Sequence, residues 1–287
     1  MTDKELLSCV KGTSAYLWFR RDVTDETIQR LVRLRPDLTK VNLLACKNVT
    51  NKGLQTLTVL QNLRELDVRD TSVTDVGLLQ SLQLMYNLKV LDLEGKTQMT
   101  VAVIQTLQDM PSLTELNLGL EFEDFTTDVL EALQRLENLT RLNLTNVNWT
   151  AQVFQALQGM PNLTELGLHG VENVTDEVIH ALTGLQNLRV LYLTGCEQVT
   201  AEGLRALAAL PNLTGLFLDR MLNFTGKDLR VLTALANLTE LGLDCTGVTG
   251  EDDFSVLKAS PKLALICLNG KKETGDDLKA FLAGQLQ

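Results

Sequence analysis

The sequence predicts an α/β solenoid, in which short parallel strands line one side of the chain and short helices line the other. Three regularities support this: a leucine recurs about every 25 residues, a threonine recurs in every unit, and the five prolines share one position in the repeat. A period of this length is typical of stacked repeats, because one unit alone cannot bury its apolar face. We therefore expect a single domain over 1–287, with a helical cap over 1–12, about eleven repeats over 13–275 and a closing helix over 276–287.

The recurring leucines define the strands. These anchors are Leu38, Leu63, Leu88, Leu113, Leu139, Leu163, Leu188, Leu213, Leu238 and Leu263, spaced by 25 residues except for one step of 26 followed by one of 24. Apolar residues three and five positions after each anchor should point inward, as Leu191 and Leu193 do after Leu188, because alternate strand residues share a face. A degenerate first unit places Thr13, Tyr16 and Trp18 in the same register.

The recurring threonines define the helices. They are Thr24, Thr50, Thr74, Thr100, Thr126, Thr150, Thr175, Thr200, Thr225, Thr249 and Thr274. A threonine hydroxyl accepts a bond from a backbone N–H that the first helical turn leaves without a partner, so each is expected to be an N-cap. Acidic residues follow in the first turn, where they complement the helix dipole. Each proline lies two residues before an anchor, where it ends the helix.

The motif resembles the leucine-rich repeat family from about Thr13 to the end of the chain. The segments LYLTGCEQVTAEGL, residues 191–204, and LLACKNVTNKGL, residues 43–54, are similar to its cysteine-containing subclass. That resemblance implies a horseshoe with a parallel sheet on the concave side and helices outside. Members of the subclass often serve as recognition arms of ubiquitin ligases behind an F-box. Only about twelve residues precede the first repeat, too few for an F-box, and most units lack the cysteine.

Composition narrows the partner classes. The balance of 26 basic against 36 acidic residues, −10, argues against non-specific binding to nucleic acid and against anionic membranes. No apolar run reaches the roughly 18 residues of a membrane helix, and the first residues lack a signal core and a cleavage site. The five cysteines have no CxxC spacing and are expected to be reduced. Nine N-x-S/T sequons occur, but several recur as NLT at one repeat position. We expect a soluble, cytoplasmic chain.

The outward strand positions predict the binding surface. They hold nine acids and three bases, which favours a basic partner. In the central column Tyr192 and Phe217 stand between Gly167 and Gly242, an arrangement that predicts an aromatic hot spot with room beside it. The alternative is drift of the repeat surface, with the rings packing on each other. The predicted partner-binding residues are His169, Tyr192, Phe217, Asp219, Asp244, Glu165, Arg141 and Glu240.

Two irregular segments allow more than one interpretation. In GLEFEDFTT, residues 119–127, the extra residue could carry Glu121, Glu123 and Asp124 to a binding rim beside Trp149, or be an insertion absorbed by a tolerant loop. The strand LALICL, residues 263–268, could be an uncovered edge through which the chain weakly self-associates. Alternatively, the tail FLAGQLQ covers that edge and the chain is a monomer.

Nothing in the sequence indicates catalysis. His180 lies in a helical run, and His169 has only Cys196 of the next unit near it, a residue expected to point inward. No phosphate loop, metal-ligand spacing or nucleophile elbow occurs, so no cofactor, no metal and no enzymatic activity are predicted. We expect a protein-binding scaffold. The alternative is an adaptor or effector subunit that recruits a ubiquitin-ligase-like or GTPase-regulatory machine.

Overall fold

The computed structural model describes residues 1–95, 99–119, 127–145, 151–249, 252 and 254–282, which form two compact units, Met1–Leu142 and Asn143–Gln287. The N-terminal unit contains α1 (Asp3–Ser8), β1 (Val10–Lys11), β2 (Ser14–Tyr16), α2 (Asp25–Leu34), β3 (Lys40–Asn42), α3 (Asn51–Leu57), β4 (Glu65–Asp67), α4 (Asp75–Leu82), β5 (Val90–Leu93), α5 (Val101–Leu107), β6 (Glu115–Gly119) and α6 (Thr127–Gln134). Strand β7 (Arg141–Thr145) begins at the end of this unit.

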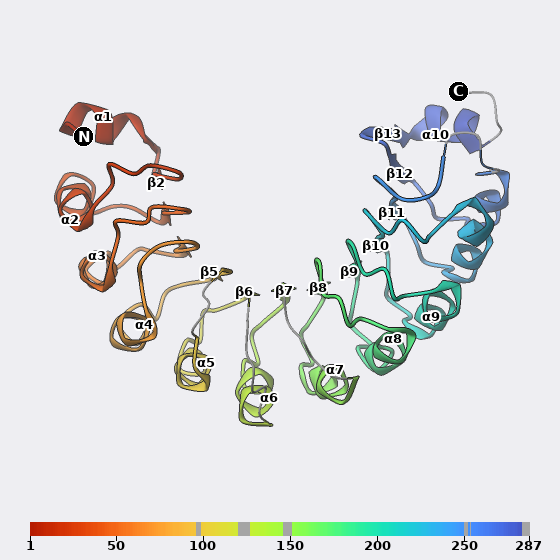
Figure 1. Cartoon of the computed structure of the whole chain (residues 1–287), viewed down its shortest axis with the longest axis horizontal. Coiled ribbons are helices and arrows are strands. Elements are labelled where there is room, and N and C mark those ends of the chain that lie inside the picture. Colours follow the sequence, from red (N-terminus) through yellow and green to blue (C-terminus); the bar gives the residue numbers. More distant parts are fainter. Residues whose placement is uncertain (96–98, 120–126, 146–150, 250–251, 253, 283–287) are drawn as a thin grey trace. The chain divides into compact units, whose positions relative to one another are not determined.

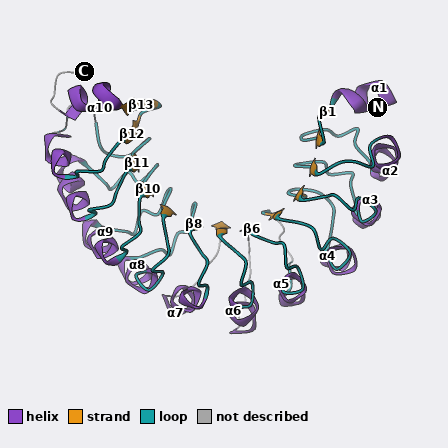
Figure 2. Ribbon diagram, turned by 180° about the vertical axis from the view of Figure 1, so that it is seen from behind, coloured by secondary structure: helices purple, strands orange, loops and turns teal. Residues whose placement is uncertain are grey.

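The C-terminal unit repeats the same alternation of strand and helix. It contains α7 (Ala151–Ala156), η1 (Leu157–Gly159), β8 (Glu165–Gly167), α8 (Asp176–Leu182), β9 (Val190–Tyr192), α9 (Ala201–Ala206), η2 (Leu207–Ala209), β10 (Gly215–Phe217), η3 (Gly226–Ala234), β11 (Glu240–Gly242), η4 (Phe254–Ala259), β12 (Leu265–Leu268), β13 (Lys271–Thr274) and α10 (Gly275–Leu282). Within each unit the strands lie on one side and the helices on the other (Figures 1 and 2). We call the side of the strands that faces away from the helices the sheet face.

The strands follow chain order within each unit, and consecutive repeats pair in parallel with one fixed register. Leu66 pairs with Val41 and with Leu91 in the N-terminal unit, and Leu191 pairs with Leu166 and with Leu216 in the C-terminal unit. These inward residues are at most 1% exposed. The predicted leucine ladder is therefore the core of each unit, and the residues on either side of each inward leucine lie on the sheet face.

Thr50 and Thr200 cap helices as predicted, and they also join neighbouring repeats. Thr74, Thr100 and Thr175 hold the N-cap position, but their hydroxyls do not make the predicted bond to the helix backbone. Thr200 donates its backbone N–H and its hydroxyl to the carboxylate of Asp176 in the preceding repeat, at 2.8 and 2.6 Å. Thr50 bonds to Asp25 in the same way, at 2.8 and 2.6 Å. The acid at the start of one helix thus holds the cap of the next, a role beyond the dipole effect expected from the sequence.

Glycine three positions after the threonine makes room for this acid. A Cβ at Gly203 would clash with the carboxylate of Asp176, and a Cβ at Gly53 would come within 2.5 Å of the Asp25 carboxylate. The recurrent pattern of a threonine followed three positions later by a glycine is therefore explained by the hydrogen bond between the threonine and the acid of the preceding repeat. A larger residue at the glycine position would displace the acid from the next threonine.

We expect the Asp176 and Gly203 positions to be energetically coupled. Asp176→Ala removes the Thr200 bonds, and Gly203→Ala displaces the same carboxylate, so each should lower the free energy of unfolding by about 1 to 2 kcal/mol, the scale of a lost helix cap. Because both changes remove one interaction, Gly203→Ala should cost clearly less in the Asp176→Ala background. Urea unfolding of the four proteins measures this cycle. Strictly additive losses would contradict the shared bond.

The asparagines of the NLT segments have a structural role. Asn138 donates its side-chain amide to the carbonyl of Pro111 at 2.9 Å, and Asn237 donates to the carbonyl of Pro211 at 2.6 Å. Asn212 donates to the carbonyl of Gln186 at 2.9 Å. Since each amide bonds to the preceding repeat, the recurrence of these sequons follows from the stacking of repeats.

The first repeat departs from the predicted register by one residue. Ala15 pairs with Val41 and is fully buried together with Leu17, so these two residues hold the inward positions. The prediction that Tyr16 and Trp18 point inward is wrong: Trp18 is 52% exposed, and its ring lies 5.8 Å from that of Tyr16. A strand with Ala15 and Leu17 inward and a strand with Tyr16 and Trp18 inward have the same period of two residues. The prediction chose the second, because Tyr16 and Trp18 are the larger residues.

The C-terminal edge also differs from the prediction. Strand β13 pairs antiparallel with β12, with Leu265 opposite Thr274 and Leu268 opposite Lys271. The interpretation of β12 as an uncovered edge is therefore wrong, because β13 pairs along it. The new edge is short and carries Lys271 and Lys272, features that disfavour pairing with another chain. The basis for self-association through this end is removed.

Candidate functional site

Three aromatic rings lie in a continuous row on the sheet face of the C-terminal unit, one pair stacked and the other tilted. The rings of Tyr192 on β9 and Phe217 on β10 lie nearly parallel, with centroids 4.7 Å apart and planes at 14°. On the other side His169, two residues beyond β8, has its ring centroid 5.4 Å from that of Tyr192, at 42°. All three residues are half-buried, and we call them the aromatic stack.

The aromatic stack is held in place by the parallel register. Phe217 pairs directly with Tyr192, which places the two side chains one strand apart on the same face. Beyond Phe217, the paired residue of β11 is Gly242. A Cβ at Gly242 would come within 2.6 Å of the Phe217 ring, so the ring leans over this glycine. The stack therefore depends on a neighbour without a side chain.

The glycines do not leave the open space that the sequence suggested. Phe217 and Asp219 occupy the space above Gly242, and Asn143 and His169 occupy the space above Gly167. The idea that a partner's side chain fits beside the rings at these positions is wrong. What the structure presents instead is a low, continuous surface made by the rings themselves.

The acids near the aromatic stack differ in their roles. Asp219 accepts a bond from the backbone N–H of Asp244 at 2.8 Å, and Asp244 accepts one from Gly270 at 2.8 Å. Burial raises the pKa of the Asp219 carboxyl, while the Asp244 N–H and His169 oppose that change. These two acids are part of the loop structure. Glu165 on β8 is half-buried, and Glu240 on β11 is exposed.

Cys196 cannot act as a nucleophile beside His169. It is fully buried, as expected, and its Sγ donates to the carbonyl of Leu168 at 3.0 Å. Burial raises the pKa of the thiol to about 12, far from the value at which a thiolate forms near neutral pH. Cys46 repeats the arrangement, donating to the carbonyl of Leu17 at 2.9 Å.

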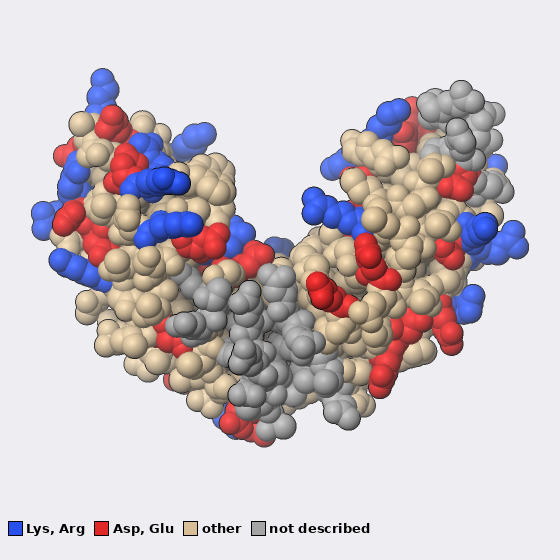
Figure 3. Space-filling model, viewed as in Figure 1, with Lys and Arg blue, Asp and Glu red and all other residues tan. Residues whose placement is uncertain are grey.

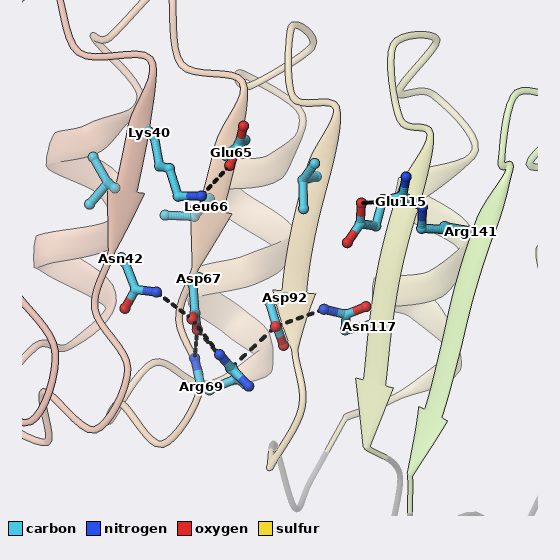
Figure 4. Close-up of a pocket in the computed structure, with 12 residues that line it drawn as sticks. Lys40, Asn42, Glu65, Leu66, Asp67, Arg69, Asp92, Glu115, Asn117 and Arg141 are labelled. Carbon is cyan, nitrogen blue, oxygen red and sulfur yellow. Dashed lines mark hydrogen bonds and ion pairs between the residues drawn. The ribbon is translucent and has the colours of Figure 1, made fainter. Parts of the chain in front are cut away.

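Arg141 belongs to the N-terminal unit and has its own partner there. Its guanidinium bonds to Glu115 on β6 at 2.8 Å, and Lys40 on β3 bonds to Glu65 on β4 at 2.6 Å. These pairs line a hollow of about 420 Å³ on the sheet face of this unit (Figure 4). Arg141 is one of the predicted partner-binding residues, and its contact within the N-terminal unit is with Glu115.

A buried ionic network fills the floor of this hollow. Arg69 contacts Asp67 at 2.8 Å, Asp92 at 3.2 Å and Glu94 at 3.3 Å. Asn42 and Asn117 complete the column by donating to Asp67 and Asp92 at 2.9 and 2.7 Å (Figure 4). Sequence reasoning placed these residues on the sheet face but missed the network. The sequence did contain a signal: Asp67 and Asp92 hold the same position in adjacent strands. Two neighbouring carboxylates repel each other unless a cation lies between them.

The network makes stability depend on pH through Asp92. Burial raises the pKa of its carboxyl from 3.8 to about 6, although Asn117 and Arg69 oppose that change. Between those values the folded state binds more protons than the unfolded state, so the contribution of Asp92 to stability falls as pH rises. The wild type should therefore lose about 1 to 3 kcal/mol of its free energy of unfolding, relative to the Asp92→Asn variant, between about pH 4 and pH 7. Urea unfolding at both pH values measures this, and an unchanged difference would contradict it.

Some predicted features lie outside the described residues. These are Glu121, Glu123 and Asp124 of the irregular loop, together with Trp149. Among the residues that the structure describes, no cluster of three or more His, Cys, Asp or Glu side chains could hold a metal ion. The helices in the described ranges are all too short or too polar to cross a membrane.

Comparisons with known proteins agree with this architecture. A family model described as a leucine-rich repeat matches residues 59–79 and 184–208. The chain is similar to an internalin, InlF, of Listeria monocytogenes, with 17% identity and a TM-score of 0.51, over 100% of this chain and 88% of that one. It is also similar to a chain of the yeast Rad7 and Elc1 complex, with 18% identity and a TM-score of 0.61, over 91% of this chain and 76% of that one. No curated protein sequence gives a significant match.

These findings establish the fold as an α/β leucine-rich repeat solenoid. Proteins built this way generally act as scaffolds for protein interactions, because stacked repeats expose an extended sheet face. At these identities the likeness concerns the fold alone. What the surface of this chain binds must therefore be argued from its own residues.

Proposed function

We propose that this chain is a non-enzymatic scaffold that binds a basic protein or peptide on its sheet face, through the aromatic stack. The observation that carries the proposal is the set of three rings on consecutive repeats, 4.7 and 5.4 Å apart and only half-buried. Aromatic residues are the commonest anchors of protein interfaces, because they offer a large rigid area at small entropic cost. Packing of the rings on one another explains why they touch. A partner-binding role also explains why part of each ring stays exposed.

The charge around the aromatic stack favours a cationic partner. Glu165, Asp219, Glu240 and Asp244 all lie on strands or strand ends next to the rings. An arginine or lysine side chain laid across the rings would gain from the ring faces and from these carboxylates together. Since Gly167 and Gly242 are covered by their neighbours, the partner would rest on the rings instead of inserting between strands.

The charges should act mainly on the association rate. Glu165 and Glu240 are the suitable probes, because Asp219 and Asp244 hold backbone N–H groups of the fold. We expect Glu165→Gln with Glu240→Gln to slow association severalfold at low salt and to flatten its salt dependence. The matched control is Glu177→Gln with Glu202→Gln, which removes the same charge from exposed first turns of α8 and α9. Surface plasmon resonance measures the rates, and equal effects in both variants would refute local steering.

An adaptor role is the second candidate. The resemblance of the segments around Cys46 and Cys196 to the cysteine-containing leucine-rich repeat subclass supports this role. Both thiols are buried and donate to backbone carbonyls of earlier repeats. The solved chain of the Rad7 and Elc1 complex, which has a similar fold, belongs to the kind of assembly that an adaptor would join. Affinity capture on the wild-type chain separates the two candidates. One basic partner supports the scaffold, whereas co-purifying ligase or GTPase-regulatory components support the adaptor.

We place the chain in the cytoplasm as part of this proposal. Cys46 and Cys196 act as hydrogen-bond donors, which requires reduced thiols, and all five cysteines are free. A reducing compartment preserves such an arrangement. We further propose that the functional form is a monomer, because the C-terminal edge strand β13 is short and basic.

A further inference from the structure

The N-terminal end of the sheet face carries exposed aromatic residues that the fold does not need. Trp18 is 52% exposed and Phe19 is 73% exposed, both just after β2. The buried residue of this segment is Leu17, so the core is complete without either ring. Large exposed apolar groups that lie side by side indicate an interaction surface more often than isolated ones do.

Phe19 also has an unfavourable backbone conformation. Its φ is +55°, in the left-handed region that bulky residues avoid. The left-handed backbone recurs seven residues after the anchor in other repeats, where the residue is Gly95, Gly170 or Gly195, or a residue that is not aromatic: Ala45, Asp70, Arg220 or Cys245. Among the described residues at this position Phe19 is the one aromatic residue, and its ring adds to the exposed surface without packing in the core.

The charge at this end has the opposite sign to the rest of the chain. Residues 1–52 contain ten lysines and arginines against six acids, a balance of +4 within a chain of −10. Figure 3 shows basic side chains gathered over the first repeats of the N-terminal unit. Several are paired, such as Arg20 with Asp22 and Arg35 with Asp37. Arg21 and Lys47 are exposed and form no ion pair with the described residues.

The two unpaired cations border the exposed rings. The N–H of Phe19 donates to the carbonyl of Leu44 at 2.7 Å, and Asn48 donates to the carbonyl of Arg21 at 2.7 Å. The loop after β2 therefore runs alongside the loop after β3, which carries Lys47. Two aromatic rings and two unpaired positive charges share this pair of loops.

We propose that Trp18, Phe19, Arg21 and Lys47 form a second docking surface, which binds an acidic peptide segment carrying an aromatic or leucine side chain. The positive charges of Arg21 and Lys47 favour an acidic segment, and the exposed rings of Trp18 and Phe19 favour an apolar side chain on it. A nucleic acid fits less well, because its extended phosphate backbone would meet Glu65 and Glu115 on the following strands and Glu94 just after β5. The inference is independent of the aromatic stack, which lies in the other unit.

The test uses a displayed library of random peptides of about twelve residues, selected on the wild-type chain. Clones are then compared on an aromatic variant, Trp18→Ser with Phe19→Gly, and on a charge variant, Arg21→Glu with Lys47→Glu. Glycine at position 19 suits the left-handed backbone, so the aromatic variant should fold, and circular dichroism checks this. The matched controls are Leu222→Ser, which removes a 65% exposed apolar residue elsewhere, and Arg33→Glu with Lys52→Glu on the helix side of the same unit.

We expect a class of clones rich in Asp and Glu, with at least one aromatic or leucine residue, that binds both docking variants at least about tenfold more weakly. Their binding to the wild type should also weaken between about 50 and 300 mM salt. The controls should bind these clones as the wild type does. The proposal is overturned if no clone depends on the aromatic variant, or if the dependent clones are neutral or basic. It is equally overturned if these residues instead mediate self-association in light scattering, or bind a single-stranded oligonucleotide more tightly than any clone.

Discussion

Replacing Leu191 or Leu216 by alanine is expected to lower the free energy of unfolding by about 2 to 5 kcal/mol, the range for truncating a buried leucine. Both side chains are fully buried, and they pair directly across β9 and β10. The cavity would adjoin leucines of both flanking repeats, such as Leu166 and Leu241, which cannot close it without moving their own strands. The cost should therefore lie in the upper half of the range.

Chemical denaturation of Leu191→Ala and Leu216→Ala measures this loss. The control is Leu222→Ala, because Leu222 is 65% exposed and its truncation should change stability by less than about 0.5 kcal/mol. Because neighbouring repeats share interfaces, amide exchange should also accelerate in the repeats on both sides of the substitution. A loss below about 1 kcal/mol for both core variants would show that the strand register is wrong.

Sequence periodicity predicted the repeat because each position has one physical task. The leucines at the inward positions, such as Leu66 and Leu191, are buried as predicted, since only apolar residues fit there. The threonine caps also follow from local chemistry: Thr50 and Thr200 cap α3 and α9 as expected. The burial of Cys196 was predicted for the same reason, its place inside the repeat.

Contacts between repeats were beyond the sequence pattern. The bonds from Thr200 to Asp176 join residues 24 apart, and the acid alone suggested only a dipole effect. The Arg69 network likewise depends on which way one long side chain turns, a choice that alternation of residues does not determine. The register of the first repeat failed because Ala15 and Leu17 are smaller than the competing Tyr16 and Trp18.

The candidate site was predicted in part. Alternation placed Tyr192 and Phe217 on the sheet face and on adjacent strands, which the register bears out. It gave no information on how the rings tilt, so the space above Gly167 and Gly242 was misjudged. The role of the aromatic stack in binding stays a prediction that depends on the partner.

Loss of the aromatic stack is the largest expected effect on function. Tyr192→Ala and Phe217→Ala should each weaken partner binding by at least about 1 to 2 kcal/mol, about 5- to 30-fold, because each ring supplies anchor area at the centre of the surface. The rings support one another at a centroid distance of 4.7 Å, so removal of one should also loosen the other. The losses should appear mainly as faster dissociation.

The most direct test compares the affinity of the captured partner for the wild-type chain and for the Tyr192→Ala, Phe217→Ala double variant, by isothermal titration calorimetry. Tyr192→Phe keeps the ring and should bind as the wild type does, and so should Tyr86→Ala, which removes a 51% exposed ring outside the sheet face. Circular dichroism establishes that every variant is folded. The account predicts that the double variant loses at least about tenfold in affinity while both controls retain theirs. Equal affinity of the folded double variant and the wild type would show that the partner binds elsewhere.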